Sequence, residues 1–391
     1  MSDSEHRAAL ATTVGYFIVF IALGLTLSII GPTLPGLSQI VKKPIADLGI
    51  IFTAREVGIM ITAFLGARLY DRVQGHHLLA GGLITASILL CIIPLAPSIP
   101  LMSVLFVLLG VGLGLLDIGC NTLMIWVHGE KVSPYMNSLH FFFGIGAFIS
   151  PVIVAQVTQT TVGVKLAYWI LAAAMLPAAF NILRLPSPIH PHKIDANGQD
   201  VTPNYPMVLL IAFFLAMYVG AEVAYGGWIS TYVLIQNMAS EASAAYLASV
   251  FWGAFTFGRL AGIPTAMRLS PDKFIYICLL GSFVCLALLA LIPGSITVIY
   301  IATFGFGFFI GPIFATMMAM MGRVMRVTGK TTGLIFMGAG VGAMTIPWGV
   351  GRLIAVFGPV AFVYCVIVPI LAGIIILSSI LALRRKQVAT G

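Results

Sequence analysis

An aspartate and an asparagine stand four residues apart in a strongly apolar stretch, where polar side chains are unexpected. In an α-helix this spacing places the side chains of Asp117 and Asn121 on one face. A carboxylate beside an amide oxygen could take up a proton, bind hydroxyl groups, or begin the oxygen ligand set of a sodium ion. We therefore predict a functional site at Asp117 and Asn121, with sodium as the candidate metal.

Other ionisable residues also interrupt apolar stretches. Glu222 is followed by the pair Gly226-Gly227, which weakens a helix and could mark an unwound segment. His140 could carry a proton or donate a hydrogen bond to a hydroxyl. Arg55 and Glu56 are adjacent, so their side chains leave a helix about 100° apart, and we do not expect them to pair with each other. Arg55 could instead neutralise a carboxylate on another helix or bind substrate.

Several tryptophans accompany these polar residues. An indole face packs well against the apolar C–H face of a pyranose ring, while carboxylates and amides bind its hydroxyls. Trp126 and Trp169 suit the interface between membrane and water. We predict that substrate contacts come from Asn121, His140, Glu222, Tyr225, Trp228, Trp252 and Trp348, and that coupling to an ion involves Asp117, Asn121, Glu222 and Arg55.

The composition identifies the solvent that these residues meet. The chain has 391 residues, of which 60% are hydrophobic and 8% charged, whereas a soluble domain carries about 25% charge. This excludes a soluble enzyme, a disordered protein and a nucleic-acid-binding protein, and it makes membrane lipid the main partner. Ionisable groups inside a bilayer cost several kcal/mol, so each one above is a functional candidate. The five cysteines lie in apolar runs without metal-type spacing, and we expect no cofactor apart from a coupling ion, sodium or proton.

Apolar runs long enough to cross a bilayer occur twelve times, since a crossing needs about 20 residues. We expect an all-α integral membrane protein with twelve transmembrane helices. The run after Arg7 is too long for a signal-peptide core, so we interpret it as a retained first helix. The predicted crossings are roughly 13–34, 47–67, 77–96, 101–126, 134–157, 164–184, 206–235, 242–263, 273–292, 296–321, 331–354 and 360–383.

Lysine and arginine predict the orientation. If both termini are cytoplasmic, most of the basic residues fall on the cytoplasmic side, including Arg259, as the positive-inside rule requires. Only Lys42, Lys43, Lys165 and Arg352 then lie outside. The one long polar connection divides the chain into an N-terminal six-helix bundle (1–185), a cytoplasmic linker (186–205) and a C-terminal six-helix bundle (206–391).

Glycines indicate an internal repeat of six helices. The motif at Gly144–Pro151 recurs at Gly340–Pro347, 196 residues later, and other glycine pairs recur at nearly the same offset. Because six helices return the chain to the same side, both copies run through the membrane in the same direction. Two such pseudo-symmetric bundles are the architecture of the major facilitator fold.

A charged loop follows the second predicted crossing. In the loop Gly66–Gly75, Arg68, Asp71 and Arg72 could form an ion-pair cluster on the cytoplasmic side. Breaking and making this cluster would bias inward-open against outward-open states. We predict a gating role for these three residues.

Several of these motifs resemble one known family. The loop Gly66–Gly75 is similar to the signature loop of the major facilitator superfamily. The more specific motifs resemble its sodium-dependent glucose transporter branch, which is related to the fucose:proton symporters. They are Asp117 with Asn121, then Trp126, Gly129, Pro134, Met136, Leu139-His140-Phe141, Gly146-Ala147-Phe148 and Pro151, together with Gly31–Pro35, Val219–Gly226 and Phe251-Trp252-Gly253.

The resemblance implies a secondary active transporter that moves a monosaccharide such as glucose, together with a cation, by alternating access. In the fucose symporters a carboxylate of the fourth crossing, followed by an asparagine, acts in coupling and sugar recognition; Asp117 and Asn121 occupy the matching positions. Those symporters also use a carboxylate in the first crossing, where this chain has only Thr26, Ser28 and Thr33. This departure leaves Glu222 or a sodium ion to substitute.

Other functions fit the same fold. A lipid or glycolipid flippase would need an amphipathic cavity, and a drug:proton antiporter a motif that Gly144–Pro151 only partly matches. A membrane sugar sensor that does not transport usually adds a long cytoplasmic tail, and only about eight residues follow the last crossing. We do not expect an enzyme, because no pairing of nucleophile and base is recognisable. We expect a monomer in the plasma or inner membrane.

Overall fold

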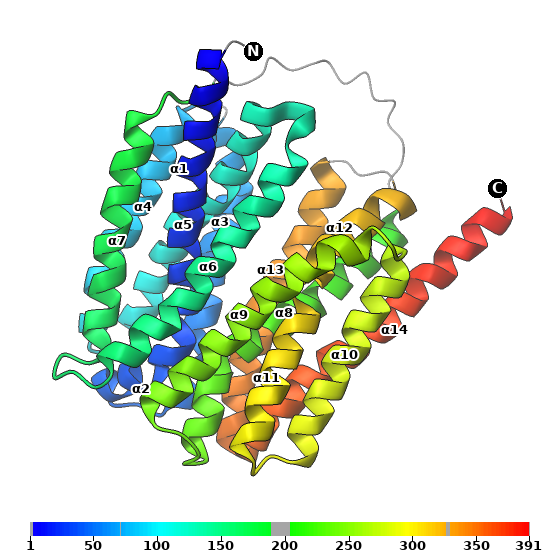
Figure 1. Cartoon of the computed structure of the whole chain (residues 1–391). Helices are drawn as coiled ribbons and strands as arrows, with labels where there is room; N and C mark the ends of the chain where they lie inside the picture. Colours follow the sequence, from blue (N-terminus) through cyan, green and yellow to red (C-terminus); the bar gives the residue numbers. More distant parts are fainter. Residues whose placement is uncertain (1–2, 71, 189–203, 326–328, 391) are drawn as a thin grey trace. The chain divides into compact units, whose positions relative to one another are not determined.

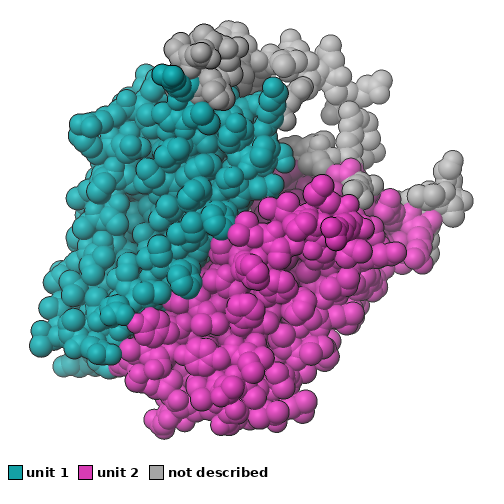
Figure 2. All heavy atoms as spheres, viewed as in Figure 1, with its two compact units in different colours: residues 1–196 teal, residues 197–391 magenta. Residues whose placement is uncertain are grey.

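The computed structural model describes residues 3–70, 72–188, 204–325 and 329–390, and the regular elements in these ranges are all helices. The chain divides into two compact units, residues 1–196 and 197–391 (Figure 2). Most of the predicted linker 186–205 lies outside the described residues. Each unit is described by itself below.

The first unit is built from seven described α-helices and three short 3₁₀ turns. The turns are η1 (Ile45–Gly49), η2 (Ile93–Leu95) and η3 (Gly129–Lys131). The helices are α1 (Asp3–Ser28), α2 (Ile30–Val41), α3 (Ile50–Tyr70), α4 (Gly75–Ile92), α5 (Ile99–His128), α6 (Ser133–Val157) and α7 (Val164–Arg184).

The second unit has the same number of described α-helices. They are α8 (Tyr205–Ile235), α9 (Glu241–Ala266), α10 (Pro271–Leu291), α11 (Ile296–Ile310), α12 (Ile313–Val324), α13 (Gly329–Phe357) and α14 (Val360–Thr390).

Eleven stretches of the described residues are long and apolar enough to cross a membrane. They match the predicted crossings except the eighth, which corresponds to α9. This helix has 26 residues, and its serines, its threonines and Arg259 lower its hydropathy. With α9 included, and with α1 counted with α2 and α11 with α12, the described helices supply the twelve predicted crossings of an all-α membrane protein.

Two predicted crossings are broken by proline. The first was expected as one helix over 13–34, but α1 ends at Ser28 and α2 begins at Ile30. Pro32 has no N–H to donate to the carbonyl of Ser28, so the hydrogen-bond ladder is interrupted there. Pro312 has the same effect between α11 and α12. Both breaks lie inside apolar sequence, and hydropathy alone does not reveal them.

Three helix pairs that pack together in the first unit have equivalents in the second. In the first unit α1 packs on α6, α3 on α5 and α4 on α7; in the second α8 packs on α13, α9 on α11 and α10 on α14. Figure 1 shows α13 in orange beside α8 in green, and α6 in teal beside α1 in blue. The second set repeats the first in order, as expected for two pseudo-symmetric bundles.

Glycines create these close helix contacts. A Cβ atom on Gly146 of α6 would collide with the carbonyl of Ile21 in α1, and one on Gly342 of α13 would collide with the carbonyl of Ala216 in α8. Small residues of this kind let membrane helices approach backbone to backbone. Gly146 and Gly342 are 196 residues apart, so the glycine repeat in the sequence marks equivalent contacts in the two units.

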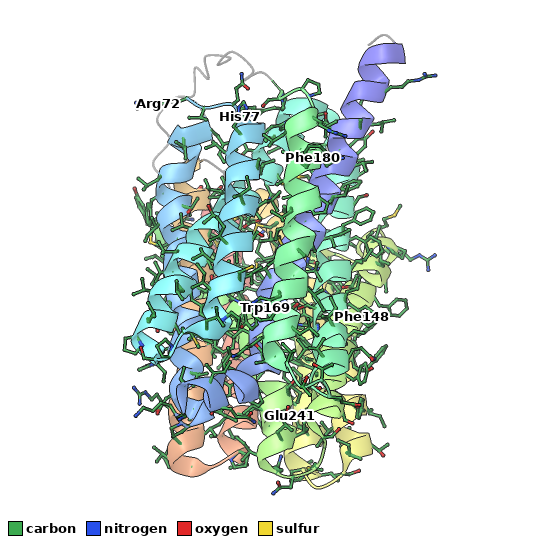
Figure 3. The ribbon with its side chains drawn as sticks, turned by 90° about the vertical axis from the view of Figure 1, so that its left-hand side faces the viewer. Arg72, His77, Phe148, Trp169, Phe180 and Glu241 are labelled. Atoms are coloured by element: carbon green, nitrogen blue, oxygen red, sulfur yellow. The ribbon has the colours of Figure 1, made fainter. Side chains whose placement is uncertain are left out.

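Apolar side chains also cover the outside of the units. In Figure 3, Phe148, Trp169 and Phe180 are labelled on the outside of the first unit, where 42%, 39% and 56% of their surface is exposed. Aromatic residues left in contact with solvent over so much of their surface are unusual on a soluble protein. In a bilayer the same side chains would contact lipid tails.

A buried histidine ties the end of α7 to α1 and α4. His76 Nδ1 lies 3.0 Å from the carbonyl of Leu185, so this nitrogen carries the proton. Nε2 therefore accepts a hydrogen bond from the Tyr16 hydroxyl at 2.9 Å, and the backbone N–H of His76 donates to Ser187 Oγ at 3.3 Å. The residues that lead out of the first unit are thus held by the side chain and the backbone N–H of one residue.

Replacing His76 with alanine should lower the free energy of unfolding by about 2–3 kcal/mol, because the buried Tyr16 hydroxyl and the half-buried Leu185 carbonyl would lose their hydrogen-bond partner. Thermal unfolding of purified protein in detergent measures the change. His77→Ala is the matched control, since this neighbouring histidine is exposed (Figure 3). An equal loss in both variants would contradict a specific anchoring role.

Candidate functional site

Asp117 and Asn121 interact directly on one face of α5. The amide nitrogen of Asn121 donates to Asp117 Oδ1 at 3.0 Å and to the backbone carbonyl of Asp117 at 2.8 Å. Both side chains keep part of their surface accessible. Because the amide nitrogen is used in this way, the Asn121 side-chain oxygen and the second carboxylate oxygen of Asp117 remain available to accept hydrogen bonds or to bind a cation.

Arg55 and Glu56 form an ion pair, contrary to the expectation that they would not meet. Arg55 Nε and Nη2 donate to Glu56 Oε1 at 3.0 and 2.5 Å, and Nη1 donates to the carbonyl of Leu27 in α1 at 3.1 Å. The 100° angle between adjacent residues separates the Cβ atoms, but the long arginine side chain curls around the helix and closes the gap. The pair is buried, with 3% and 8% of the residue surfaces exposed.

The pair in α3 and the polar face of α5 belong to one cluster. The carboxylates of Glu56 and Asp117 interact electrostatically, so the ion pair of α3 and the carboxylate of α5 influence each other. We name Arg55, Glu56, Asp117 and Asn121 the acidic cluster. With both carboxylates ionised its net charge is −1, which favours a bound cation in a medium of low dielectric constant.

Two glycines bring α3 and α5 together at this cluster. A Cβ on Gly110 of α5 would collide with the carbonyl of Arg55, and a Cβ on Gly58 of α3 would collide with the carbonyl of Val107. The two backbones therefore touch within one turn of the ion pair. This contact positions Glu56 beside Asp117.

Replacing Gly110 with alanine should destabilise the protein by about 1–3 kcal/mol, because the new methyl group forces α3 away from α5. Gly81→Ala on α4 is the control: a Cβ there meets no atom within 4 Å, and alanine favours a helix more than glycine does. Thermal unfolding in detergent compares the two. Equal stability of both variants would show that the contact between α3 and α5 is loose.

The remaining predicted residues of the first unit are His140 and the three residues of the charged loop, which lie partly outside the described residues. His140 is half-buried in α6, and its ring meets Phe20 of α1 edge-on at 5.6 Å between centroids. Arg72 is exposed and is labelled in Figure 3. Asp71 and the side chain of Arg68 lie outside the described residues. The gating role of this loop stays a prediction.

A second polar group lies within the other unit, on α8 and α9. Glu222 of α8 interacts electrostatically with Arg259 of α9 and with the hydroxyl of Tyr218. Arg259 Nε donates to the carbonyl of Gly311 at 3.2 Å, in the break between α11 and α12, and its guanidinium lies 4.3 Å above the ring of Phe255. We name Tyr218, Glu222 and Arg259 the α8–α9 triad.

Tyr225 and Trp228 are buried packing residues in this conformation. The Tyr225 hydroxyl is 2.8 Å from Thr303 Oγ1, and its ring packs on Phe251, Phe306 and Phe362. Trp228 has no exposed surface, and its indole nitrogen donates to the carbonyl of Pro347 at 2.9 Å. Trp228 therefore fills the interior of the unit here instead of offering a face for stacking.

The other two predicted tryptophans differ in exposure. Trp252 is 6% exposed and meets Phe251 and Phe255 edge-on. Trp348 on α13 is 40% exposed, and the Arg352 guanidinium lies 5.8 Å from its ring centroid. Of the tryptophans predicted to bind substrate, Trp348 has the most accessible indole.

The predicted unwinding at Gly226-Gly227 does not occur. Helix α8 is continuous from Tyr205 to Ile235. Gly226 instead allows close packing, because a Cβ at this position would lie 2.9 Å from atoms of Phe251 and Trp252. Glycine here makes room for aromatic rings of α9.

Tyr218 and Arg259 were not predicted as site residues. Arg259 falls inside the predicted crossing 242–263, but it was assigned to the cytoplasmic charges that set the orientation. Tyr218 precedes Glu222 by four residues, the spacing that places two side chains on one helix face. The same spacing that identified Asp117 with Asn121 could therefore have identified Tyr218 with Glu222.

Comparison with known proteins identifies the family. Residues 16–347 match the family described as Major Facilitator Superfamily. The chain belongs to the major facilitator superfamily. The match covers most of the described helices of both units, and it agrees with the all-helical architecture and the repeated helix pairs. Major facilitator proteins are transporters, and the chain is an integral membrane transporter of this class.

Among curated members of the superfamily, the chain is similar to proteins named sodium-dependent glucose transporter 1. It is 28% identical to the human protein over 85% of this chain and 72% of that protein, and 25% identical to the mouse protein 1A over 86% and 88%. The zebrafish protein is 30% identical over 86% of this chain and 63% of its own length. These relatives belong to the branch that the sequence motifs resemble.

Solved structures of the superfamily confirm the fold. The nucleoside transporter NupG is 14% identical and covers 96% of this chain and 99% of its own, with a TM-score of 0.75. A bacterial homolog of the human lysosomal transporter Spinster, in an inward-facing and unoccupied conformation, is 12% identical with a TM-score of 0.69, over 98% and 97% of the two chains. At such identities the likeness concerns the fold alone.

Proposed function

We propose that this protein is a secondary active transporter that couples the movement of a monosaccharide such as glucose to the movement of a cation in the same direction, by alternating access. The acidic cluster is the observation that carries the proposal. Asp117 and Asn121 offer carboxylate and amide oxygens on one face of α5, and Glu56 adds a second carboxylate close by.

The charge balance of the cluster supports a cation as the coupling species. Two carboxylates and one guanidinium leave one negative charge, whose burial in a membrane is unfavourable. A bound cation removes this cost, so the loaded and empty states differ in their ability to change conformation. Oxygen ligands suit sodium, and the relatives named sodium-dependent glucose transporters support sodium before the proton.

The proposal also covers the oligomeric state of the protein and its place in the cell. We propose that the protein acts as a monomer in the plasma or inner membrane, with both termini in the cytoplasm, and catalyses no chemical reaction. The small hydrophilic substrate is supported by the polar groups of α3, α5 and α8, since each carries hydrogen-bonding side chains in an apolar environment. Arg72 and its loop would act on the exchange between conformations.

Transport by purified protein in liposomes tests the proposal. Labelled glucose and a panel of other neutral hexoses are supplied outside, with an inward gradient of sodium, potassium or protons. We expect accumulation above the outside concentration with sodium, and its loss when an ionophore dissipates the sodium gradient. Equal uptake with potassium would contradict sodium coupling. If no sugar is transported but a lipid probe is, the protein is a flippase instead. If no sugar is transported but a lipophilic cation is, it is an antiporter.

A further inference from the structure

The α8–α9 triad has hydrogen-bonding capacity that the protein leaves unused. Tyr218 is 2% exposed, and its hydroxyl has no partner at full hydrogen-bonding distance and angle, although Glu222 and Arg259 act on it from close by. Glu222 and Arg259 are its ionisable neighbours; these two described residues interact electrostatically without a direct ion pair between them. Buried polar groups in folded proteins normally have partners, so this unmet capacity points to a ligand.

The guanidinium of the triad is fixed in place. Arg259 Nε donates to the carbonyl of Gly311, which lies in the break between α11 and α12. The ring of Phe255 packs against one face of the guanidinium. Gly258 allows this approach, because a Cβ there would collide with the carbonyl of Phe308. The two terminal nitrogens of Arg259 are left to act toward Tyr218 and Glu222. The site is therefore built by the fold and held rigidly.

The charges of the triad select the ligand. One guanidinium and one carboxylate balance, so the triad is neutral overall, unlike the acidic cluster. A neutral triad gives no net attraction that would offset the cost of moving an anion or a cation out of water. A neutral ligand with neighbouring hydroxyls satisfies both charged groups, because each hydroxyl donates one hydrogen bond and accepts two.

An aromatic surface adjoins the triad. The ring of Tyr218 lies 6.4 Å from that of Phe314 between centroids, and Phe314 lies 5.9 Å from Phe336, which is 44% exposed. Aromatic rings pack against the apolar C–H face of a ring-shaped ligand. Hydroxyl-binding groups beside such a surface suit a cyclic polyol.

We propose that Tyr218, Glu222 and Arg259 form a subsite for the neighbouring hydroxyls of a neutral cyclic polyol and set the selectivity of the transporter against charged sugars. This inference rests on the proposed function and deepens it. Glu222 accepts hydrogen bonds from the hydroxyls, Arg259 donates to their oxygens, and the Tyr218 hydroxyl completes the set. The proposed cation site thus lies on α3 and α5, and this subsite adds hydroxyl recognition by α8 and α9.

Binding of three sugars that differ in charge tests the subsite. The full-length protein in detergent with sodium is titrated with glucose, glucuronate and protonated glucosamine, and thermal stabilisation gives each affinity. The wild type should prefer glucose. Glu222→Gln leaves a net positive charge and should shift the preference toward glucuronate by roughly tenfold, while Arg259→Gln should shift it toward glucosamine by a similar factor. The double variant should restore the preference for glucose.

Matched variants separate selectivity from folding. Tyr218→Phe and Arg259→Lys keep the charges and should weaken glucose binding without changing the charge preference. Lys273→Met removes an exposed charge of the same unit and should change nothing. If the single charge variants weaken all three ligands equally, the triad is structural and this inference fails while the proposed function stands. If the wild type binds no sugar at all, the proposed function fails as well.

Discussion

Replacing Asp117 with asparagine is expected to abolish sodium-driven accumulation of sugar, leaving at most equilibration across the membrane. The variant keeps the size of the side chain and the position of Asn121, but it removes the negative charge that attracts the cation. Losing a charged partner costs about 1.5–3 kcal/mol, equivalent to roughly 10- to 100-fold in cation affinity. Uptake into liposomes under a sodium gradient measures the accumulation ratio.

Two comparisons make this result specific. Glu241→Gln removes an exposed carboxylate at the start of α9 (Figure 3) and should accumulate sugar like the wild type. Exchange of sugar between equal concentrations on both sides reports whether the Asp117 variant still cycles. Concentrative uptake by the Asp117→Asn protein would remove this residue from the coupling role.

Replacing Arg55 with methionine is expected to cost about 3–5 kcal/mol in unfolding free energy. The change leaves the buried carboxylate of Glu56 without its partner, and breaking a buried ion pair from one side costs this much. It also leaves the Leu27 carbonyl of α1 without a donor. Chemical or thermal unfolding in detergent gives the difference from the wild type.

A double variant distinguishes the loss of a partner from the loss of the arginine itself. Arg55→Met with Glu56→Gln carries no unpaired charge and should recover a large part of the stability, because two neutral side chains replace the pair. Lys43→Met, at an exposed position, should be nearly neutral. If the double variant is as unstable as the single one, the hydrogen bond to Leu27 dominates and the ion pair matters little.

The helices and their repeat could be predicted because lipid imposes a simple rule on sequence. Every crossing needs an apolar run of sufficient length, and α7 occupies the predicted range 164–184 at both ends. Glycine repeats identify helix contacts because only glycine allows two backbones to touch, as at Gly146 and Gly342. Composition and small-residue spacing therefore determine much of the architecture.

The partners of the polar residues could be predicted only where they share a helix face. Asp117 and Asn121 were found from their spacing of four. The pairing of Arg55 with Glu56 depends on how a long side chain curls, and the approach of Arg259 to Glu222 depends on how α9 packs on α8. Trp228 became a packing residue because α13 supplies an acceptor at Pro347. Such contacts between helices leave no recognisable pattern in the amino-acid sequence.

The ion pair of α3 has a consequence for how the chain enters the membrane during synthesis. An arginine at the centre of an inserting helix costs about 2.5–3.5 kcal/mol, and most such charges must wait for a partner on a later helix. Arg55 and Glu56 are consecutive and bond within one helix, so the pair can form as soon as α3 is helical. This segment can therefore leave the translocon as a nearly neutral helix before α5 and its Asp117 have been synthesised.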